Sequence, residues 1–251
     1  METLAAVIQT TGLTKRYDHQ TAVDHLDFKV MEGEIFGFLG PNGAGKTTTL
    51  LMLLGLSRPS EGTALVCGLD PERKAMEVKK IVGYLPENVG FYGDMDAVQS
   101  LRYIADLNRF PGSQAENRIQ EVLKLVGLSE DSRKKVSAFS RGMKQRLGIA
   151  EVLLKDPKVL LLDEPTLGLD PDGAMRLIEL IQSLNQERRI TVLLSSHHLQ
   201  QVQKISHRVG IMIKGRMVAE GSIDALAREK FGVGEEKFTL EEIYMKYFQE
   251  V

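Results

Sequence analysis

The chain has 251 residues, of which 43% are hydrophobic and 26% charged, so it can bury a substantial core and does not have the composition of a disordered or collagen-like protein. Its 32 Lys and Arg against 34 Asp and Glu give a formal net charge of -2, which argues against a globally basic nucleic-acid-binding protein. The single cysteine, Cys67, excludes an internal disulfide. Its longest apolar runs, such as Leu50–Leu54, are far shorter than the ~20 residues that span a bilayer, and the N-terminus does not resemble a signal peptide, so we expect a chain that neither crosses a membrane nor is exported.

Short β-rich runs alternate with amphipathic helical stretches along the chain, which is typical of an α/β layer fold. In the N-terminal part the pattern predicts strands at Leu4–Thr10, Phe28–Val30, Ile35–Leu39, Thr63–Cys67 and Ile81–Leu85, a loop at Gly40–Gly45 and a helix at Lys46–Leu56.

The middle of the chain changes to a helical pattern between Asp96 and Lys155. Apolar residues recur there at helical spacing, for example at Ile119, Val122, Leu123 and Val126, and Gly127 marks a helix end. This pattern predicts a helical insertion within the α/β frame.

After this insertion the strand pattern returns. The sequence predicts strands at Val159–Leu162 and Thr191–Leu194 and a hairpin of Val209–Ile213 with Met217–Ala219. Asp170-Pro171 predicts a helix start, with Asp as N-cap and Pro at the first helical position, and Thr239–Glu242 is a capping box before a last short helix. We expect one domain at residues 1–231, with a helical subdomain at about 88–155, and a short helical tail at 232–251.

The strongest chemical signal is Gly40–Thr47, which reads GPNGAGKT and matches the P-loop pattern between a predicted strand and a predicted helix. Its glycines let backbone N–H groups converge on phosphate oxygens, and the positive end of the following helix points at the same anion. Lys46 adds a charge for the β- and γ-phosphates, and the Thr47 hydroxyl is a suitable Mg²⁺ ligand. The residues expected to hold the phosphates are Gly40, Pro41, Asn42, Gly43, Ala44, Gly45, Lys46, Thr47 and Thr48.

The second signal is an apolar strand that ends in two acids, Asp163 and Glu164. The carboxyl ends of strands in α/β proteins form the edge where ligands bind. Asp163 is expected to hold Mg²⁺ through water, and Glu164 to orient or deprotonate a water that attacks the γ-phosphate.

With these motifs in order, the chain from about Leu13 to Glu220 resembles an ATP-binding cassette (ABC) ATPase, the nucleotide-binding subunit of an ABC transporter. The resemblance implies a P-loop core with an N-terminal antiparallel β subdomain and an inserted α-helical subdomain. It also implies four roles: Tyr17 stacks on adenine, Ser140 and Gly142 bind the γ-phosphate of an ATP held by another subunit, Asp170 belongs to a loop at the dimer interface, and His197 is the switch histidine that reaches the γ-phosphate. The adjacent His197 and His198 do not predict a metal pair, because neighbouring side chains diverge in a helix or strand.

The chain departs from the family's usual pattern at two motifs. The signature motif, usually Leu-Ser-Gly-Gly-Gln, is replaced by Phe139–Met143, which retains the serine and the second glycine. The usual glutamine of the lid loop is Glu87, whose carboxylate can ligate Mg²⁺ but adds like-charge repulsion beside the γ-phosphate. Both departures resemble a bacterial and archaeal subgroup of drug and antibiotic exporters, so the resemblance favours export.

The resemblance therefore implies an ATPase that uses ATP and Mg²⁺, with Thr47, Asp163 and Glu87 near the metal and Lys46, Glu164, His197 and Glu87 in catalysis. It implies an ATP-dependent homodimer, or a heterodimer with a similar ATPase, that moves a substrate through a separate membrane permease. We expect it at the cytoplasmic face of the membrane, held there by the permease, and expect no nucleic acid partner. The alternatives are an ABC ATPase that acts on ribosomes or nucleic acid, and a regulatory subunit that binds ATP without hydrolysis.

Overall fold

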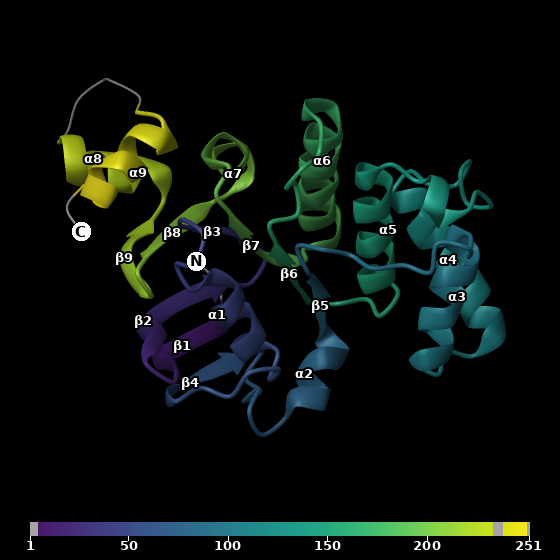
Figure 1. Cartoon of the computed structure of the whole chain (residues 1–251), viewed down its shortest axis with the longest axis horizontal. Coiled ribbons are helices and arrows are strands. Elements are labelled where there is room, and N and C mark those ends of the chain that lie inside the picture. The colour runs from purple at the N-terminus through teal and green to yellow at the C-terminus, as the bar shows by residue number, and fades with distance from the viewer. Residues whose placement is uncertain (1–4, 233–237, 250–251) are drawn as a thin grey trace.

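Two sheets and the helices around them make up the computed structural model, which describes residues 5–232 and 238–249 (Figure 1). The first sheet is antiparallel, with the order β2-β1-β4, and contains β1 (Ala6–Tyr17), β2 (Gln20–Met31) and β4 (Glu61–Val66). The second has the order β5-β6-β7-β3-β8-β9 and contains β3 (Ile35–Leu39), β5 (Val82–Leu85), β6 (Val159–Asp163), β7 (Thr191–Ser196), β8 (Arg208–Ile213) and β9 (Arg216–Gly221). Its first five strands are parallel and β9 is antiparallel.

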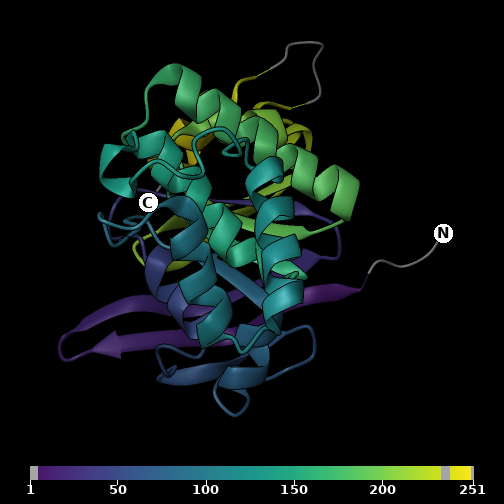
Figure 2. The same cartoon turned by 90° about the vertical axis from the view of Figure 1, so that its right-hand side faces the viewer.

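The helices lie on both faces of the parallel sheet and beside it. They are α1 (Lys46–Leu53), α2 (Ala75–Ile81), α3 (Ala97–Leu107), α4 (Gly112–Leu125), α5 (Arg141–Leu153), α6 (Pro171–Arg188), α7 (Leu199–Ile205), α8 (Ile223–Phe231) and α9 (Leu240–Gln249). Figure 2 views the molecule from the side of α3 and α4, which stand in front of the sheet. Within the described residues, no helix is long and apolar enough to span a membrane.

Two hydrophobic cores lie on opposite faces of the parallel sheet. Successive residues of a strand point to opposite faces, so Phe36 and Phe38 pack toward α1 and the antiparallel sheet, whereas Ile35 and Leu39 pack toward α5, α6 and α7. Every residue of β3, β6 and β7 is buried, as expected for parallel strands that are covered on both faces. These strands therefore form a rigid support for the loops at their carboxyl ends.

The strand order brings the carboxyl ends of β6, β7 and β3 together. The predicted strand Ile35–Leu39 is confirmed, and it pairs with β7 on one side and β8 on the other. Because β7 lies between β3 and β6, the residues that follow β7 lie between the P-loop and the acids that end β6. The fold thus positions three chemically active segments at one edge.

Several predicted helix ends are confirmed by their capping contacts. The Asp170 carboxylate accepts from the Gly173 N–H at 2.8 Å at the start of α6. Glu242 accepts from the Thr239 N–H at 2.7 Å, and its own N–H donates to the Thr239 hydroxyl, which is the predicted capping box of α9. Gly127 follows α4 with a φ of 64°.

Other predicted bounds differ from the structure. The predicted strand Leu4–Thr10 starts outside the described residues and continues to Tyr17 as β1, because this strand pairs with both β2 and β4. The predicted helix Lys46–Leu56 ends at Leu53. Ile81, predicted to begin a strand, instead ends α2, a short helix that the apolar pattern did not predict because Val78 is its one buried residue.

Candidate active site

The loop between β3 and α1 forms one wall of a cleft with a volume of about 400 Å³. The cleft brings together predicted and additional residues: Tyr17, Gln20, Ala22, Asn42, Gly43, Ala44, Gly45, Lys46, Thr47, Thr48, Glu87 and Glu164. Gly45 has a φ of +103°, and a Cβ there would lie 2.3 Å from the Ala22 carbonyl oxygen. A Cβ on Gly40 would lie 2.3 Å from the Met212 carbonyl oxygen. Both positions therefore need glycine, and α1 presents its positive end to the cleft.

Lys46 is almost completely buried at the inner end of the cleft. Its ammonium group donates to the carbonyl oxygens of Gly40 at 2.7 Å and Pro41 at 3.3 Å. Its Nζ also lies 3.3 Å from Oε1 of Glu164. This carboxylate oxygen accepts no hydrogen bond from the described residues, so the ion pair is what compensates its burial.

Glu164 connects Lys46 to His197. Its second oxygen, Oε2, lies 2.9 Å from Nδ1 of His197 and also accepts from the His197 N–H at 3.3 Å. Glu164 has a φ of 46°, which is uncommon for a residue with a Cβ and occurs where tertiary contacts hold the backbone. The structure thus brings three of the predicted catalytic residues into one continuous chain of polar contacts.

Asp163 lies beside this chain and is held by β7. Its Oδ1 accepts from the Ser195 hydroxyl at 2.5 Å, and the Ser195 Oγ in turn accepts from the Glu164 N–H at 3.1 Å. Asp163 is 2% exposed and does not line the cleft itself, whereas Thr47 is exposed there.

The donor atoms of Thr47, Asp163 and Glu87 fit Mg²⁺, because hydroxyl and carboxylate oxygens are the ligands that this hard cation prefers. Within residues 5–232 and 238–249, no group of three or more His, Cys, Asp or Glu could hold a metal ion. A Mg²⁺ ion in this cleft would therefore take most of its ligands from phosphate and water, as Mg²⁺ commonly does.

Tyr17 and Glu87 lie at the outer part of the cleft. The Tyr17 ring is 47% exposed, and Nζ of Lys15 lies 4.8 Å from its centroid. Glu87 is exposed and its carboxylate accepts from the Asn88 amide at 3.5 Å. Burial raises the pKa of Tyr84 to about 12, and the negative charges of Asp163 and Glu87 raise it further. Both acids are therefore close enough to act on the same hydroxyl group.

Ser140, Gly142 and Asp170 do not meet the P-loop within one chain. They line a different cleft of about 240 Å³, where α5 and α6 begin. Ser140 is exposed, and its hydroxyl accepts from the Met143 N–H at 3.2 Å as the N-cap of α5. The N-termini of two helices therefore face this second cleft.

The His197 and His198 rings do not diverge as the sequence predicted. Their centroids lie 4.2 Å apart at an interplanar angle of 35°. The pair lies between the end of β7 and the start of α7, where the backbone is neither strand nor helix, so the alternation argument does not apply.

Comparison with known proteins decides the family. The protein-family model described as ABC transporter matches residues 23–167, more than half of the chain. The chain belongs to the ABC transporter family. Two relatives are the bacitracin transport ATP-binding protein BcrA of Bacillus licheniformis, 44% identical over 90% of this chain and 72% of the relative, and the Nod factor export ATP-binding protein I of Paraburkholderia xenovorans, 37% identical over 90% and 74%. A solved structure described as the ATP binding subunit of an ABC transporter aligns with a TM-score of 0.83 at 28% identity and covers 98% of this chain and 100% of that chain.

The ABC family confirms the predicted class of fold and activity. The chain has the α/β P-loop core of an ABC ATPase with an antiparallel sheet and an inserted group of helices. It is an ATP-binding and ATP-hydrolysing subunit of an ABC transporter.

Sequence reasoning on this ABC subunit missed two residues at the site, Ser195 and Gln20, and one that shares a neighbouring pocket with His197, Gln201. Ser195 was not predicted to be a site residue, although its hydroxyl holds Asp163. Gln20 lines the cleft because it pairs with Tyr17 across a two-residue turn, and the two strands predicted here, Leu4–Thr10 and Phe28–Val30, included neither residue. Gln201 on α7 accepts from the Thr166 hydroxyl at 2.5 Å, a contact between distant segments with no local signal.

Proposed function

We propose that this subunit binds ATP with Mg²⁺ in the P-loop cleft and hydrolyses it between two copies of the chain, or between this chain and a similar ATPase. The observation that carries this proposal is the arrangement Lys46–Glu164–His197, with contacts of 3.3 Å and 2.9 Å at the inner end of a cleft lined by the P-loop. Backbone N–H groups of residues 40–48 hold the phosphates, and Lys46 exchanges its present carbonyl partners for phosphate oxygens. Tyr17 stacks on the base.

In this proposal Thr47 ligates Mg²⁺, Asp163 contacts it through water, and Glu87 lies near it. The ion, when bound, neutralises charge that develops on the transferred phosphoryl group. Glu164 accepts a proton from the attacking water, for which its carboxylate lies at the correct edge of the sheet. His197, bonded to the same carboxylate, orients Glu164 and contacts the γ-phosphate.

The second cleft supplies the other half of the site from a second copy. Ser140 and Gly142 offer a hydroxyl and a backbone N–H at a helix N-terminus, which is a suitable environment for a phosphate. Asp170 lies in the same cleft and belongs to the interface in this proposal. The two clefts have no lining residue in common, and in this proposal the phosphates of one nucleotide contact both by bridging two chains.

We further propose that the dimer drives export through a separate permease at the cytoplasmic face of the membrane. The names of two relatives, one a bacitracin transport protein and one a Nod factor export protein, support export. The proposed permease contact is the aromatic surface after β5 and on α3, where Tyr92 is 58% and Tyr103 41% exposed and their rings lie 5.7 Å apart. Phe91 packs beneath this surface against the core.

The decisive experiment measures dimerisation by light scattering in a Glu164→Gln variant with ATP and Mg²⁺. We expect hydrolysis to fall by about 100-fold or more, the usual contribution of a general base, and a stable dimer to accumulate. Adding Ser140→Asp should abolish this dimer while ATP still binds, because Asp preserves the N-cap but places a negative charge against the phosphate. Ser222→Asp at the N-cap of α8 is the matched control and should still dimerise. A Glu164→Gln variant that stays monomeric, or hydrolyses ATP at the wild-type rate, would contradict the proposal.

A further inference from the structure

The turn of the β8–β9 hairpin contacts both walls of the nucleotide cleft. The Gly215 N–H donates to the Ala44 carbonyl oxygen in the P-loop at 3.1 Å. The Gly215 carbonyl oxygen accepts from the Asp24 N–H on β2 at 2.8 Å. A single residue of the turn therefore bridges the phosphate-binding loop and the antiparallel sheet.

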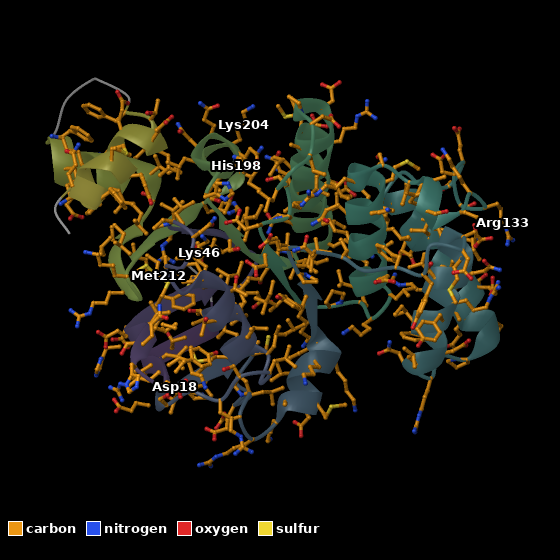
Figure 3. The ribbon with its side chains drawn as sticks, in the orientation of Figure 1. Asp18, Lys46, Arg133, His198, Lys204 and Met212 are labelled. Atoms are coloured by element: carbon orange, nitrogen blue, oxygen red, sulfur yellow. The ribbon has the colours of Figure 1, made fainter. Side chains whose placement is uncertain are left out.

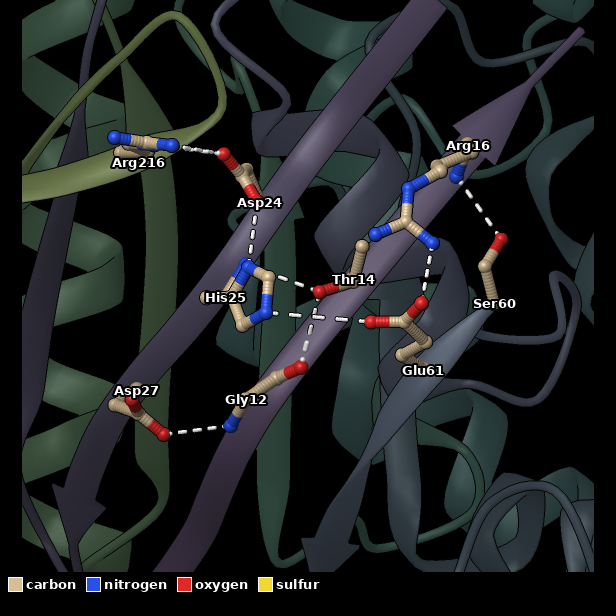
Figure 4. A network of polar contacts seen from close by, with 9 residues as sticks. All are labelled: Gly12, Thr14, Arg16, Asp24, His25, Asp27, Ser60, Glu61 and Arg216. Atoms are coloured by element: carbon tan, nitrogen blue, oxygen red, sulfur yellow. Dashed lines mark hydrogen bonds and ion pairs between the residues drawn. The ribbon is translucent and has the colours of Figure 1, made fainter.

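An ion pair fastens the same turn to β2. Arg216 donates from Nε at 2.7 Å, and its Nη2 lies 2.6 Å from the same Oδ2 of Asp24 (Figure 4). The other oxygen of Asp24 lies 2.6 Å from Nδ1 of His25. Hydrogen bonds from His25 and Arg216 hold the pKa of Asp24 below its ordinary value, so the carboxylate is charged where the pair forms. Another ion pair in this region, Arg16 with Glu61, joins β1 to β4, and Oε2 of Glu61 lies 4.0 Å from Nε2 of His25, so the network around Asp24 continues to β4.

The hairpin also packs against the P-loop with no free space. A Cβ on Gly45 would lie 2.8 Å from Cε of Met212, the residue labelled near Lys46 in Figure 3. A Cβ on Gly215 itself would lie 3.1 Å from the Ala22 carbonyl oxygen. Any shift of the hairpin must therefore move the P-loop, β2 or both.

The two walls that the turn connects carry different parts of the proposed nucleotide site. Gln20 and Ala22 on β2, with Tyr17 paired to Gln20, line the cleft on the side proposed for the base. Ala44 and Lys46 line it on the side proposed for the phosphates. The spacing of these walls decides whether base and phosphates can be bound at the same time.

We propose that Asp24, Gly215 and Arg216 are positioning residues that fix the distance between the base-binding wall and the phosphate-binding loop. The inference rests on the proposed function, because it assumes a nucleotide that contacts both walls. Removing the contacts of Asp24, Gly215 and Arg216 weakens binding of the whole nucleotide. It leaves binding of the phosphate chain intact, because the P-loop alone holds the phosphates. These three residues thus act by positioning the two walls of the cleft and do not contact the nucleotide themselves.

The test compares affinities for ATP and for inorganic tripolyphosphate, both with Mg²⁺, by titration calorimetry. Asp24→Ala and Arg216→Met each remove one partner of a pair in which the Arg216 side chain is 70% and the Asp24 side chain 20% exposed, and both variants should fold normally. We expect each to weaken ATP binding about fivefold, and the double variant to weaken it by the same factor, because the two residues act as one pair. The two single variants and the double variant should each bind tripolyphosphate with the affinity of the wild-type chain. Wild-type ATP affinity in both single variants, additive losses in the double variant, or equal weakening of both ligands would each overturn the inference.

A second pair of variants tests the turn itself. Gly215→Ala and Gly68→Ala place a side chain at φ values of +85° and +75°, but only Gly215 is packed against another strand, since nothing lies within 4 Å of a Cβ on Gly68. Gly215→Ala should lose ATP affinity and retain tripolyphosphate affinity, whereas Gly68→Ala should retain both. An unchanged ATP affinity in Gly215→Ala would overturn the inference. A wild-type chain that binds no ATP would instead contradict the proposed function.

Discussion

The ammonium group of Lys46 and the carboxylate of Glu164 form an ion pair of 3.3 Å in which neither side chain is more than 7% exposed. Charges this deeply buried need compensating partners, and His197 supplies the second one for Glu164 at 2.9 Å. A phosphate that enters the P-loop adds a stronger anion beside Lys46. In the proposed mechanism this anion would release Glu164 from the pair, at the place where the attacking water has to be deprotonated.

Lys46→Ala should remove most of the affinity for ATP. The variant loses the cation of the P-loop, and a hydrogen bond to a charged group contributes about 3 kcal/mol at the upper end, which corresponds to roughly 100-fold in the dissociation constant. Titration calorimetry with ATP and Mg²⁺ measures the change. Lys80→Ala, an exposed lysine on α2, is the control and should bind normally. Near-normal ATP affinity in Lys46→Ala would exclude this role.

Ser195→Ala should raise the Mg²⁺ concentration needed for half-maximal ATP hydrolysis. The hydroxyl donates to Asp163 at 2.5 Å, and its removal frees the carboxylate to rotate away from the metal position. Loss of a hydrogen bond worth about 1 kcal/mol predicts a rise of roughly fivefold. Ser100→Ala on α3 removes a buried hydroxyl that donates to the Asp96 backbone carbonyl at 3.0 Å, and it should leave the Mg²⁺ dependence unchanged. An unchanged Mg²⁺ dependence in Ser195→Ala would refute the prediction.

Glu87→Gln should retain ATP hydrolysis or increase it by a few-fold. The amide oxygen still offers a ligand to Mg²⁺, and the substitution removes a negative charge from a cleft that receives a polyphosphate. Steady-state phosphate release measures the effect, with Glu72→Gln on the surface before α2 as the control. Complete loss of hydrolysis would mean that the carboxylate itself is required.

Glu151→Gln should stabilise the fold at alkaline pH. Burial in α5 raises the pKa of Glu151 from an ordinary 4.5 to about 7. At a pH between these two pKa values, the unfolded chain has released the proton of Glu151 and the folded chain has not. The free energy of unfolding therefore falls as the pH rises through this range, and above pH 7 the total loss is at most about 3 kcal/mol. Thermal unfolding should therefore show a higher Tm for Glu151→Gln than for the wild type at pH 8 and a small difference at pH 5. Glu179→Gln, an exposed acid on α6, is the control; a pH-independent difference for Glu151→Gln would contradict the assignment.

Local patterns predicted the parts of the site that depend on neighbouring residues. The strand Ile35–Leu39, the P-loop that follows it and the capped start of α6 at Asp170 depend on contacts within a few residues, so spacing alone was sufficient. The seven-residue helix α2 was missed because it has no repeated apolar face. β1 was predicted too short because polar residues near Gly12 break its alternation, while hydrogen bonds to two neighbouring strands continue it to Tyr17.

The sequence by itself determined which residues are able to bind phosphate and which can act on its metal and the attacking water. Glycines followed by lysine have the first chemistry, and an apolar strand followed by two acids has the second, in any order of strands. Only the tertiary structure decided which of them meet. Insertion of β7 between β6 and β3 places His197 beside Glu164 and Ser195 beside Asp163, and the β8–β9 turn joins Ala44 to Asp24. Such contacts join segments that are far apart in the chain. They depend on the order in which the strands pair to bury both faces of the sheet, and the spacing of neighbouring residues does not encode that order.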